Sequence, residues 1–312
     1  MLSLLCYYDY TDKEGMDMER TPSKYIVLAG TFFTSLSSII IRFSEAPALV
    51  ISSYRMLFTC IMLLPLVLKN RDEFAELNRK NLILCIISGI FLAFHYATWI
   101  SSIKLTTIAN STILVSCSPI FVALANYFII KEKLSKKMIV SIAVSLAGTI
   151  IIALESTDAS AGNMMLGNIL AFLGAVFVAG YLVIGGIVRK SLGAGAYVFV
   201  VYAVSAVALF TMCAFSGTAI YPYPPREFML FTALALFCSI LGHTLYNYMV
   251  KYVSSTLISV STLSEPIFAS LMALLIFREI PSIYTLSGGI IIISGILTYL
   301  ITQNNERLKV KN

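Results

Sequence analysis

The sequence predicts an all-α polytopic membrane protein with ten transmembrane helices, and three observations lead to this prediction. Hydrophobic residues make up 58% of the 312 residues and charged residues only 12%, with a mean hydropathy of +0.87, far from the balance of a soluble domain. Apolar runs of about 20 residues, enough to cross a bilayer, recur along almost the whole length. The second half of the chain also repeats residues of the first half at a constant offset.

The apolar runs set the bounds of the expected helices. In chain order, the ten runs are 25–44, 47–68, 82–103, 105–130, 134–154, 164–188, 195–217, 228–250, 254–277 and 282–302. The fourth run is long, and we expect it to tilt or kink at Pro119, where a helix loses a backbone hydrogen bond.

The remaining segments complete the expected division of the chain. It consists of a disordered cytoplasmic N-terminus at 1–24, a first five-helix repeat at 25–154, an external linker at 155–163, a second five-helix repeat at 164–302 and a cytoplasmic tail at 303–312. The N-terminal segment lacks the basic start and the long apolar core of a signal peptide. Met1, Met16 and Met18 are all candidates for the true start.

Lys and Arg residues indicate how the chain is oriented in the membrane. Most of the 22 fall on the side that both termini share, and the opposite side has only Arg42, Lys104, Arg226 and Arg278. An excess of basic residues marks the cytoplasmic side, so we expect both termini in the cytoplasm. The net charge of +6 then follows from membrane topology, and nucleic acid is not an expected partner.

A shift of 147 residues places the second half of the chain on the first half without a gap. The matched pairs include Pro266 on Pro119, Glu279 on Glu132, Gly295 on Gly148 and Arg189 on Arg42. Each half has five spans, an odd number, so the second half must enter the membrane in the opposite orientation. Inverted repeats of this kind are typical of secondary transporters, which bind substrate near the midplane between the halves.

A carboxyl group follows a polar stretch in the predicted ninth span. Serine and threonine residues, Ser261 among them, precede Glu265, which stands directly before Pro266. A carboxyl group inside an apolar helix normally faces the bundle interior or a water-filled path. Because desolvation disfavours the carboxylate, we expect Glu265 to exchange a proton near working pH and to couple transport to protons. The alternative is a structural role, in which protonated Glu265 donates a hydrogen bond to a carbonyl freed near one of the two prolines.

The first half contributes four candidate substrate-binding residues and one basic residue inside a span. His95 and Trp99 are four residues apart in the third span and share one face, and Asn110 and Ser111 lie among the hydroxyl residues of the fourth span. Helix packing is the alternative role for these residues. Arg55 is the only basic residue well inside a span, and snorkelling or a structural pairing is its favoured interpretation.

The second half contributes further candidates. Tyr181 lies in the glycine-rich sixth span, and His243, Tyr246 and Asn247 share a face of the eighth span. With Ser261 and the candidates of the first half, these residues are predicted to line the substrate path. Their aromatic rings and hydroxyl groups would suit an amphipathic or aromatic solute, or a cation held over a ring face.

Two stretches carry a resemblance to a known family. They are HYATWISSIKLTTIANSTILVSCSPIFVALANYFIIKEKL at 95–134 and GHTLYNYMVKYVSSTLISVSTLSEPIFASLMALLIFREIP at 242–281. Together with Arg55, Gly148 and Gly295, they resemble the EamA-type ten-helix members of the drug/metabolite transporter superfamily. The resemblance implies two inverted five-helix repeats, with spans 1, 3, 4, 6, 8 and 9 around a central cavity and spans 5 and 10 at the periphery.

The resemblance also implies a function and a location. Family members mostly export amino acids, other small metabolites or toxic compounds across the cytoplasmic membrane of bacteria and archaea. One departure from symmetry concerns Glu265, because the matching residue of the first half is Ser118. A single coupling site is therefore more plausible than two.

Enzymatic functions find no support in the sequence. It contains no H-E-x-x-H, Walker A or C-x-x-C motif, and its six cysteines are scattered singly. We therefore expect a secondary transporter without metal or cofactor, whose partners are a small-molecule substrate and the lipid bilayer. An uncoupled facilitator or exchanger and a non-transporting membrane partner or sensor stay open as alternatives, and so does a homodimer.

Overall fold

The protein is a bundle of helices, as the apolar runs predict. A computed structural model describes residues 25–129, 135–154, 162–249, 262 and 264–311. All regular secondary structure in these residues is helical. Six helical segments are long and apolar enough to cross a membrane, namely Ala48–Lys69, Arg79–Leu105, Ile108–Ala125, Asn163–Val188, Ala194–Phe215 and Pro225–Met249.

The described helices lie along the predicted runs, and residues 254–261 of the predicted ninth span lie outside the described residues. In the first half they are α1 (Tyr25–Phe43), α2 (Ala48–Lys69), the short 3-10 helix η2 (Arg71–Glu76), α3 (Arg79–Leu105), α4 (Ile108–Val115), α5 (Ser118–Ile129) and α6 (Lys136–Leu154). In the second half they are α7 (Gly162–Val188), α8 (Ala194–Phe215), α9 (Pro225–Ala233), η4 (Leu234–Thr244), α10 (Leu245–Met249), α12 (Glu265–Phe277) and α13 (Ile283–Lys311).

The predicted fourth span is divided into two helices instead of bending at its proline. Thr107 caps α4 by accepting a hydrogen bond from the backbone N–H of Asn110 at 3.1 Å, which replaces a bond that the first turn lacks. After a short turn the chain resumes as α5 at Ser118. Pro119 then lies in the first turn of a helix, where a missing N–H costs little.

The second half differs from the prediction in three places. The predicted eighth span is one continuous run of α9, η4 and α10, in which η4 is a π-helix of 11 residues, a form often found at functional sites. Helix α7 begins at Gly162, inside the predicted linker. Helix α13 continues to Lys311, so most of the predicted tail at 303–312 is helical.

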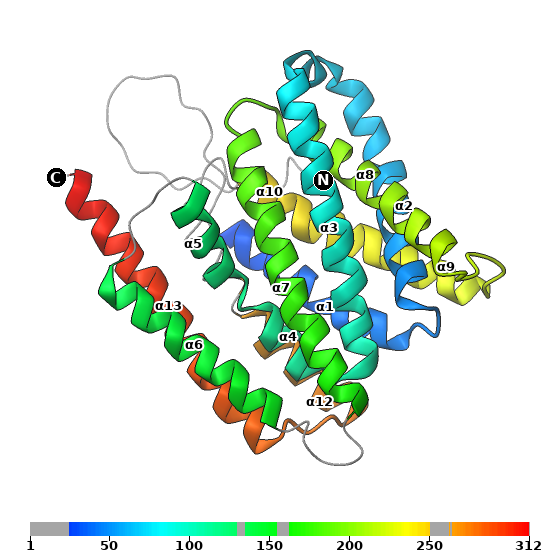
Figure 1. Cartoon of the computed structure of the whole chain (residues 1–312). Helices are drawn as coiled ribbons and strands as arrows, with labels where there is room; N and C mark the ends of the chain where they lie inside the picture. Colours follow the sequence, from blue (N-terminus) through cyan, green and yellow to red (C-terminus); the bar gives the residue numbers. More distant parts are fainter. Residues whose placement is uncertain (1–24, 130–134, 155–161, 250–261, 263, 312) are drawn as a thin grey trace.

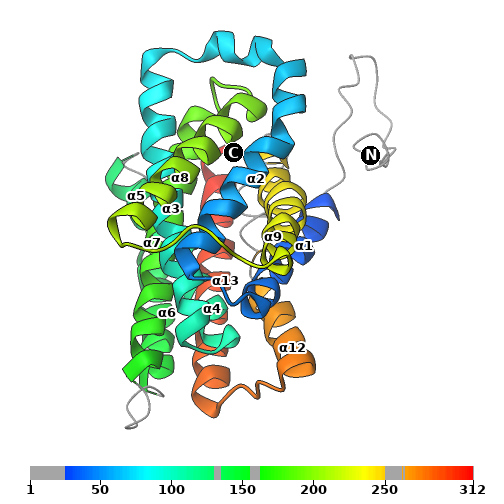
Figure 2. The same ribbon diagram turned by 90° about the vertical axis from the view of Figure 1, so that its right-hand side faces the viewer.

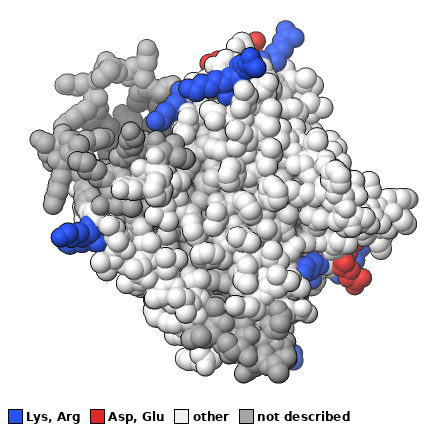
Figure 3. All heavy atoms as spheres, viewed as in Figure 1, with Lys and Arg blue, Asp and Glu red and all other residues white. Residues whose placement is uncertain are grey.

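Two connections between helices mark opposite ends of the bundle. The α2–α3 connection, with Lys69, Arg71, Arg79 and Lys80, is at the opposite end from the α12–α13 connection (Figures 1 and 2). On the face seen in Figure 3, the charged side chains lie at the edges, and a broad uncharged surface separates them. Such a surface suits the lipid interior.

Helices α6 and α13 lie side by side at one edge of the bundle (Figure 1), and glycines allow their close approach. A Cβ atom built on Gly148 would lie 2.7 Å from the carbonyl oxygen of Gly288, and one built on Gly288 would lie 2.7 Å from that of Gly148. Gly295 approaches the carbonyl oxygen of Ser141 in the same way, at 2.9 Å. Small residues of this kind are typical of helix contacts in membranes.

We expect Gly148→Ala to lower the thermal unfolding temperature of the detergent-purified protein, because the added methyl group has no space beside α13. Overpacking of this kind costs about 1–3 kcal/mol. The matched control is Gly186→Ala in α7, where a Cβ atom would meet no atom within 4 Å and alanine favours the helix by about 0.5–1 kcal/mol. Equal unfolding temperatures for the two variants would contradict the close α6–α13 contact.

Candidate functional site

The candidate site is a polar cluster around α1. Thr31, Thr34 and Ser37 are buried on this helix, where a lipid-facing position would carry apolar side chains. Helix α1 and η4 come close because Gly242 has no side chain, and a Cβ atom there would lie 2.6 Å from the methyl group of Thr34. The second half of the chain thereby contacts the first half along this polar face.

Glu265 joins the cluster at the start of α12. Its Oε2 lies 3.3 Å from Oγ1 of Thr34. The hydroxyl of Tyr246, from α10, donates to Oγ1 of Thr31 at 2.7 Å and lies 3.3 Å from Oγ1 of Thr34. Pro266 is the second residue of α12, so the proline begins a helix here. A carboxyl group, two threonines and a tyrosine thus form one network between the halves.

Arg55 lies in the same cluster and is fully buried. Its Nε donates to Ser239 of η4 and its Nη1 donates to Ser37 of α1, both at 2.9 Å. The guanidinium carbon lies 4.5 Å from the centre of the Tyr96 ring, a cation–π distance. Because the guanidinium does not reach the surface, Arg55 does not snorkel.

The two histidines have different surroundings. His95 is stacked on Trp99, with 5.8 Å between ring centres, and its Nδ1 lies 2.9 Å from the carbonyl oxygen of Gly174 in α7. His243 lies between two tyrosine rings, Tyr96 and Tyr246, each 6.2 Å away and edge-on. Its ring nitrogens take part in none of the hydrogen bonds found among the described residues, so His243 is the histidine whose nitrogens are free for a ligand.

Two other candidates bind each other. Nδ2 of Asn247 lies 2.8 Å from the hydroxyl of Tyr181, and that hydroxyl lies 3.1 Å from Oδ1 of Asn247. Asn247 Nδ2 also donates to the carbonyl oxygen of His243 at 2.9 Å. These contacts connect α7 to the segment that carries His243. The indole N–H of Trp99, by contrast, is buried without a partner in the described part of the chain.

The remaining candidates contact other helices or lie outside the described residues. Asn110 is fully buried and accepts a hydrogen bond from Thr285 of α13 at 2.6 Å. Ser111 is hydrogen-bonded to Ser102 of α3. The structure thus places both residues in contacts between helices. Ser261 lies outside the described residues.

A second group of charges joins the helices at the end of the bundle predicted to be external. Arg42 at the end of α1 pairs with Glu279 at 3.0 Å and donates to the carbonyl oxygen of Thr106 at 2.8 Å. Glu279 also accepts from the backbone N–H of Ile108 at 3.0 Å. This ion pair connects α1 to the chain segments before α4 and after α12.

A buried carboxyl group holds a neighbouring contact at the same end. Glu227 of α9 accepts hydrogen bonds from the hydroxyl of Ser44 and, at 2.9 Å, from the backbone N–H of Glu45. Lys104 at the end of α3 donates to the carbonyl oxygen of Ser44. Helices α3 and α9 therefore meet the α1–α2 connection at this end through charged and polar groups.

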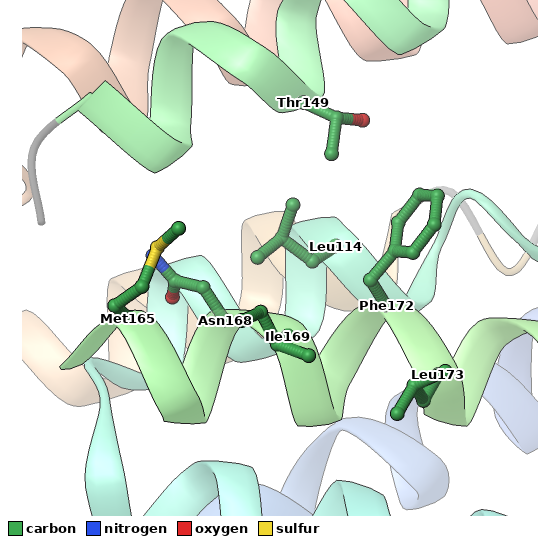
Figure 4. A pocket seen from close by; sticks show the side chains of 7 residues that line it. All are labelled: Leu114, Thr149, Met165, Asn168, Ile169, Phe172 and Leu173. Atoms are coloured by element: carbon green, nitrogen blue, oxygen red, sulfur yellow. The ribbon is translucent and has the colours of Figure 1, made fainter. Parts of the chain in front are cut away.

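A pocket of about 210 Å³ lies between α4, α6 and α7 (Figure 4). Its lining is almost entirely apolar and consists of Leu114, Thr149, Met165, Asn168, Ile169, Phe172 and Leu173. None of the candidate substrate-binding residues lines it. In the described ranges, no three His, Cys, Asp or Glu side chains are placed to hold a metal ion.

Comparison with known proteins decides the family. The EamA-like transporter family matches residues 23–154 and again residues 165–301. The chain belongs to the EamA-like transporter family. This EamA chain is therefore a polytopic membrane transporter and not an enzyme.

Relatives in bacteria and archaea agree with this assignment. The EamA chain is 25% identical over 71% of its length to an uncharacterized transporter of Archaeoglobus fulgidus, of which 75% is covered. It is 23% identical over 89% of its length to the pseudopaline exporter CntI of Pseudomonas aeruginosa, of which 95% is covered. These relatives indicate the cell membrane of a prokaryote. A crystal structure of another protein shares the fold, with a TM-score of 0.62 and 15% identity over 89% of this chain and 96% of the other.

Sequence reasoning missed several residues of the cluster in this EamA chain. Tyr96 adjoins His95, but its contact with Arg55 depends on how α2 and α3 are rotated. Ser37 and Ser239 are two of many hydroxyl residues, and only their distance from the guanidinium distinguishes them. The charge of Arg55 inside a span was the one signal that pointed to this group.

Proposed function

We propose that this EamA chain is a secondary active transporter that exports a small organic metabolite, an amino acid or an amphipathic or toxic compound. Two inverted five-helix repeats alternate between states open to either side, and proton movement through Glu265 drives export. The observation that carries the proposal is the position of Glu265. It accepts a hydrogen bond from Thr34 of the first half, and the same threonine hydroxyl lies 3.3 Å from that of Tyr246 of the second half.

Inverted repeats are supported by contacts that map onto each other. The offset of 147 residues turns the Gly148–Gly288 contact into the Gly295–Ser141 contact, and both contacts are close. In these two contacts, α6 and α13 exchange roles. Such an exchange is expected when a two-fold axis passes between the two helices. The same offset places the start of α5, at Ser118, on the start of α12, at Glu265.

Proton coupling is supported by the surroundings of Glu265. A carboxyl group in contact with the Thr34 hydroxyl can keep a hydrogen bond in both protonation states, because a hydroxyl donates or accepts. A substrate that enters between the halves would compete with the proton at this group. A change in hydration between two conformations would then load the proton on one side and release it on the other.

Export is supported by the relatives and by the charges at the two ends. One relative is named as a pseudopaline exporter. The basic residues of the α2–α3 connection mark the end that we propose to be cytoplasmic. Both termini are then cytoplasmic as well, and the end with Arg42, Glu227 and Glu279 is external and closed in this conformation.

A thermal-shift screen of the purified protein followed by counterflow tests the proposal. Amino acids, nucleosides, polyamines and cationic dyes are screened for stabilisation, since a ligand of the folded form raises apparent stability. Proteoliposomes loaded with the best ligand should then accumulate the labelled ligand in a saturable manner. Flux without saturation or counterflow would favour a facilitator, and the absence of flux for every ligand would favour a non-transporting protein.

We expect Glu279→Gln to open the external end more often, because it removes the charge that pairs with Arg42. The pair is about one quarter exposed, with side-chain exposures of 26% and 24%, so its loss is worth about 0.5–1 kcal/mol. In a background without native cysteines, Ile41→Cys should react about two to five times faster with an impermeant maleimide added outside. Glu45→Gln, which alters an exposed carboxyl group at the same end, is the matched control, and equal rates would contradict the closure.

A further inference from the structure

Arg55 is the bulkiest fully buried side chain of the described residues, and every group that holds it is neutral. Two serine hydroxyls accept from Nε and Nη1, and the Tyr96 ring covers one face of the guanidinium. Nη2 is buried and has no hydrogen-bond partner in the part of the chain that the structure describes. A guanidinium stays charged at every physiological pH, and a buried charge without a partner is costly. The site is therefore incomplete as it stands.

The acidic group of the same cluster does not complete it. Both ion pairs among the described residues involve other arginines, Arg42 and Arg226. Glu265 contacts Thr34, whereas Arg55 contacts Ser37. These two α1 residues are three positions apart, which separates their Cβ atoms by about 5–6 Å. Arg55 and Glu265 thus contact α1 about one helical turn apart, and they form no ion pair among the described residues.

We propose that Arg55 binds a carboxylate group of the transported solute. One carboxylate oxygen accepts from Nη2, and the aromatic ring of Tyr96 keeps the guanidinium plane in place for it. A solute that also carries an ammonium group directs it along α1 toward Glu265. A purely cationic solute meets an uncompensated positive charge and is disfavoured. The inference rests on the proposed transport function and specifies the chemical class of the substrate.

A purely structural role accounts for less of the geometry. If Arg55 only joined α1, α2 and η4, its two bonds to serine would suffice, and an uncharged side chain such as glutamine would provide them without burying a charge. The third nitrogen has no partner among the described residues, and this is the feature that a substrate carboxylate explains.

The first test uses the unaltered protein and three forms of the same compounds. Thermal unfolding in detergent is measured with the common amino acids, with their N-acetyl derivatives and with their amides, each at millimolar concentration. The N-acetyl forms keep only the carboxylate and the amides keep only the ammonium group. We expect stabilisation by at least one amino acid or its N-acetyl form, and none by the corresponding amide. Equal stabilisation by acid and amide, or the absence of stabilisation by any carboxylate, would overturn the proposal.

The second test uses two variants, and ligand affinity is measured on the folded fraction of each. Arg55→Gln should lower the affinity for the carboxylate compound by more than about tenfold, as expected for the loss of a charged hydrogen bond. Arg55→Lys keeps the charge and should retain part of the affinity. If neither variant folds, the comparison of acid with amide in the parent decides alone. A folded Arg55→Gln protein with the parent's affinity would refute the role of Arg55.

Counterflow separates this proposal from the proposed function. If carboxylates bind through Arg55 but no labelled compound exchanges across proteoliposomes, the site stands and the transport proposal falls. If cationic dyes exchange as well in Arg55→Gln as in the parent, transport stands and the carboxylate site falls.

Discussion

Glu265→Gln is expected to abolish substrate-driven proton movement and to leave substrate exchange intact. Glutamine keeps the shape of the side chain and an oxygen that accepts from Thr34, but it cannot gain or lose a proton. The measurement uses proteoliposomes that contain the pH-sensitive dye pyranine. Added substrate should change the internal pH with the parent protein and not with the variant, whereas exchange of labelled for unlabelled substrate should continue in both.

A variant at the exposed end of the bundle serves as the control for Glu265→Gln. Glu45→Gln makes the same chemical change at a side chain that is 88% exposed, and it should move protons as the parent does. If Glu265→Gln moves protons normally, Glu265 is structural and the coupling group lies elsewhere. His243 would then be the first residue to test, because its ring nitrogens have no partner among the described residues.

His243→Ala is expected to lower transport per folded molecule by more than about tenfold, equivalent to about 1.4 kcal/mol of binding free energy. The imidazole lies between Tyr96 and Tyr246, beside the groups that hold Glu265 and Arg55. Its removal takes away a polar group of the proposed substrate path and allows the two rings to shift. Initial rates of counterflow, divided by the amount of folded protein from size-exclusion chromatography, give the quantity to compare.

Asn110→Ala provides the contrast to His243→Ala. Asn110 accepts a hydrogen bond from Thr285 of α13, and losing a buried hydrogen bond costs about 1 kcal/mol or more. The yield of folded protein should therefore fall, while transport per folded molecule stays within about twofold of the parent. If Asn110→Ala gives a normal yield and impaired transport, Asn110 lies in the substrate path. If His243→Ala lowers the yield and leaves transport per folded molecule unchanged, His243 has a packing role.

The sequence alone was sufficient for the class of the protein and for its family. Hydropathy identifies a membrane helix because each apolar run must span the lipid by itself. The described helices accordingly follow the predicted runs, apart from the break before α5, the early start of α7 and the extension of α13. The resemblance to EamA transporters rested on two stretches, and the family match covers both halves of the chain.

The candidate residues could be named from the sequence, but their grouping could not. Charge and polarity inside apolar runs singled out Arg55, Glu265 and His243, because such groups are costly in lipid and need a reason to be there. The same signal also selected Asn110, which the structure places against Thr285 of α13. A periodic pattern gives the face of a helix, but it does not say which neighbour that face meets.

Only the tertiary structure decided which partners these residues have. Ser239 lies 184 positions from Arg55, and Thr34 lies 231 positions from Glu265. Such contacts depend on the rotation of each helix and on how closely the helices approach, which Gly242 sets between α1 and η4. A one-residue change in the π-helical turns of η4 would rotate Ser239 away from the guanidinium. The linear sequence thus determined which side chains are costly to bury in lipid, and packing determined which of them compensate one another.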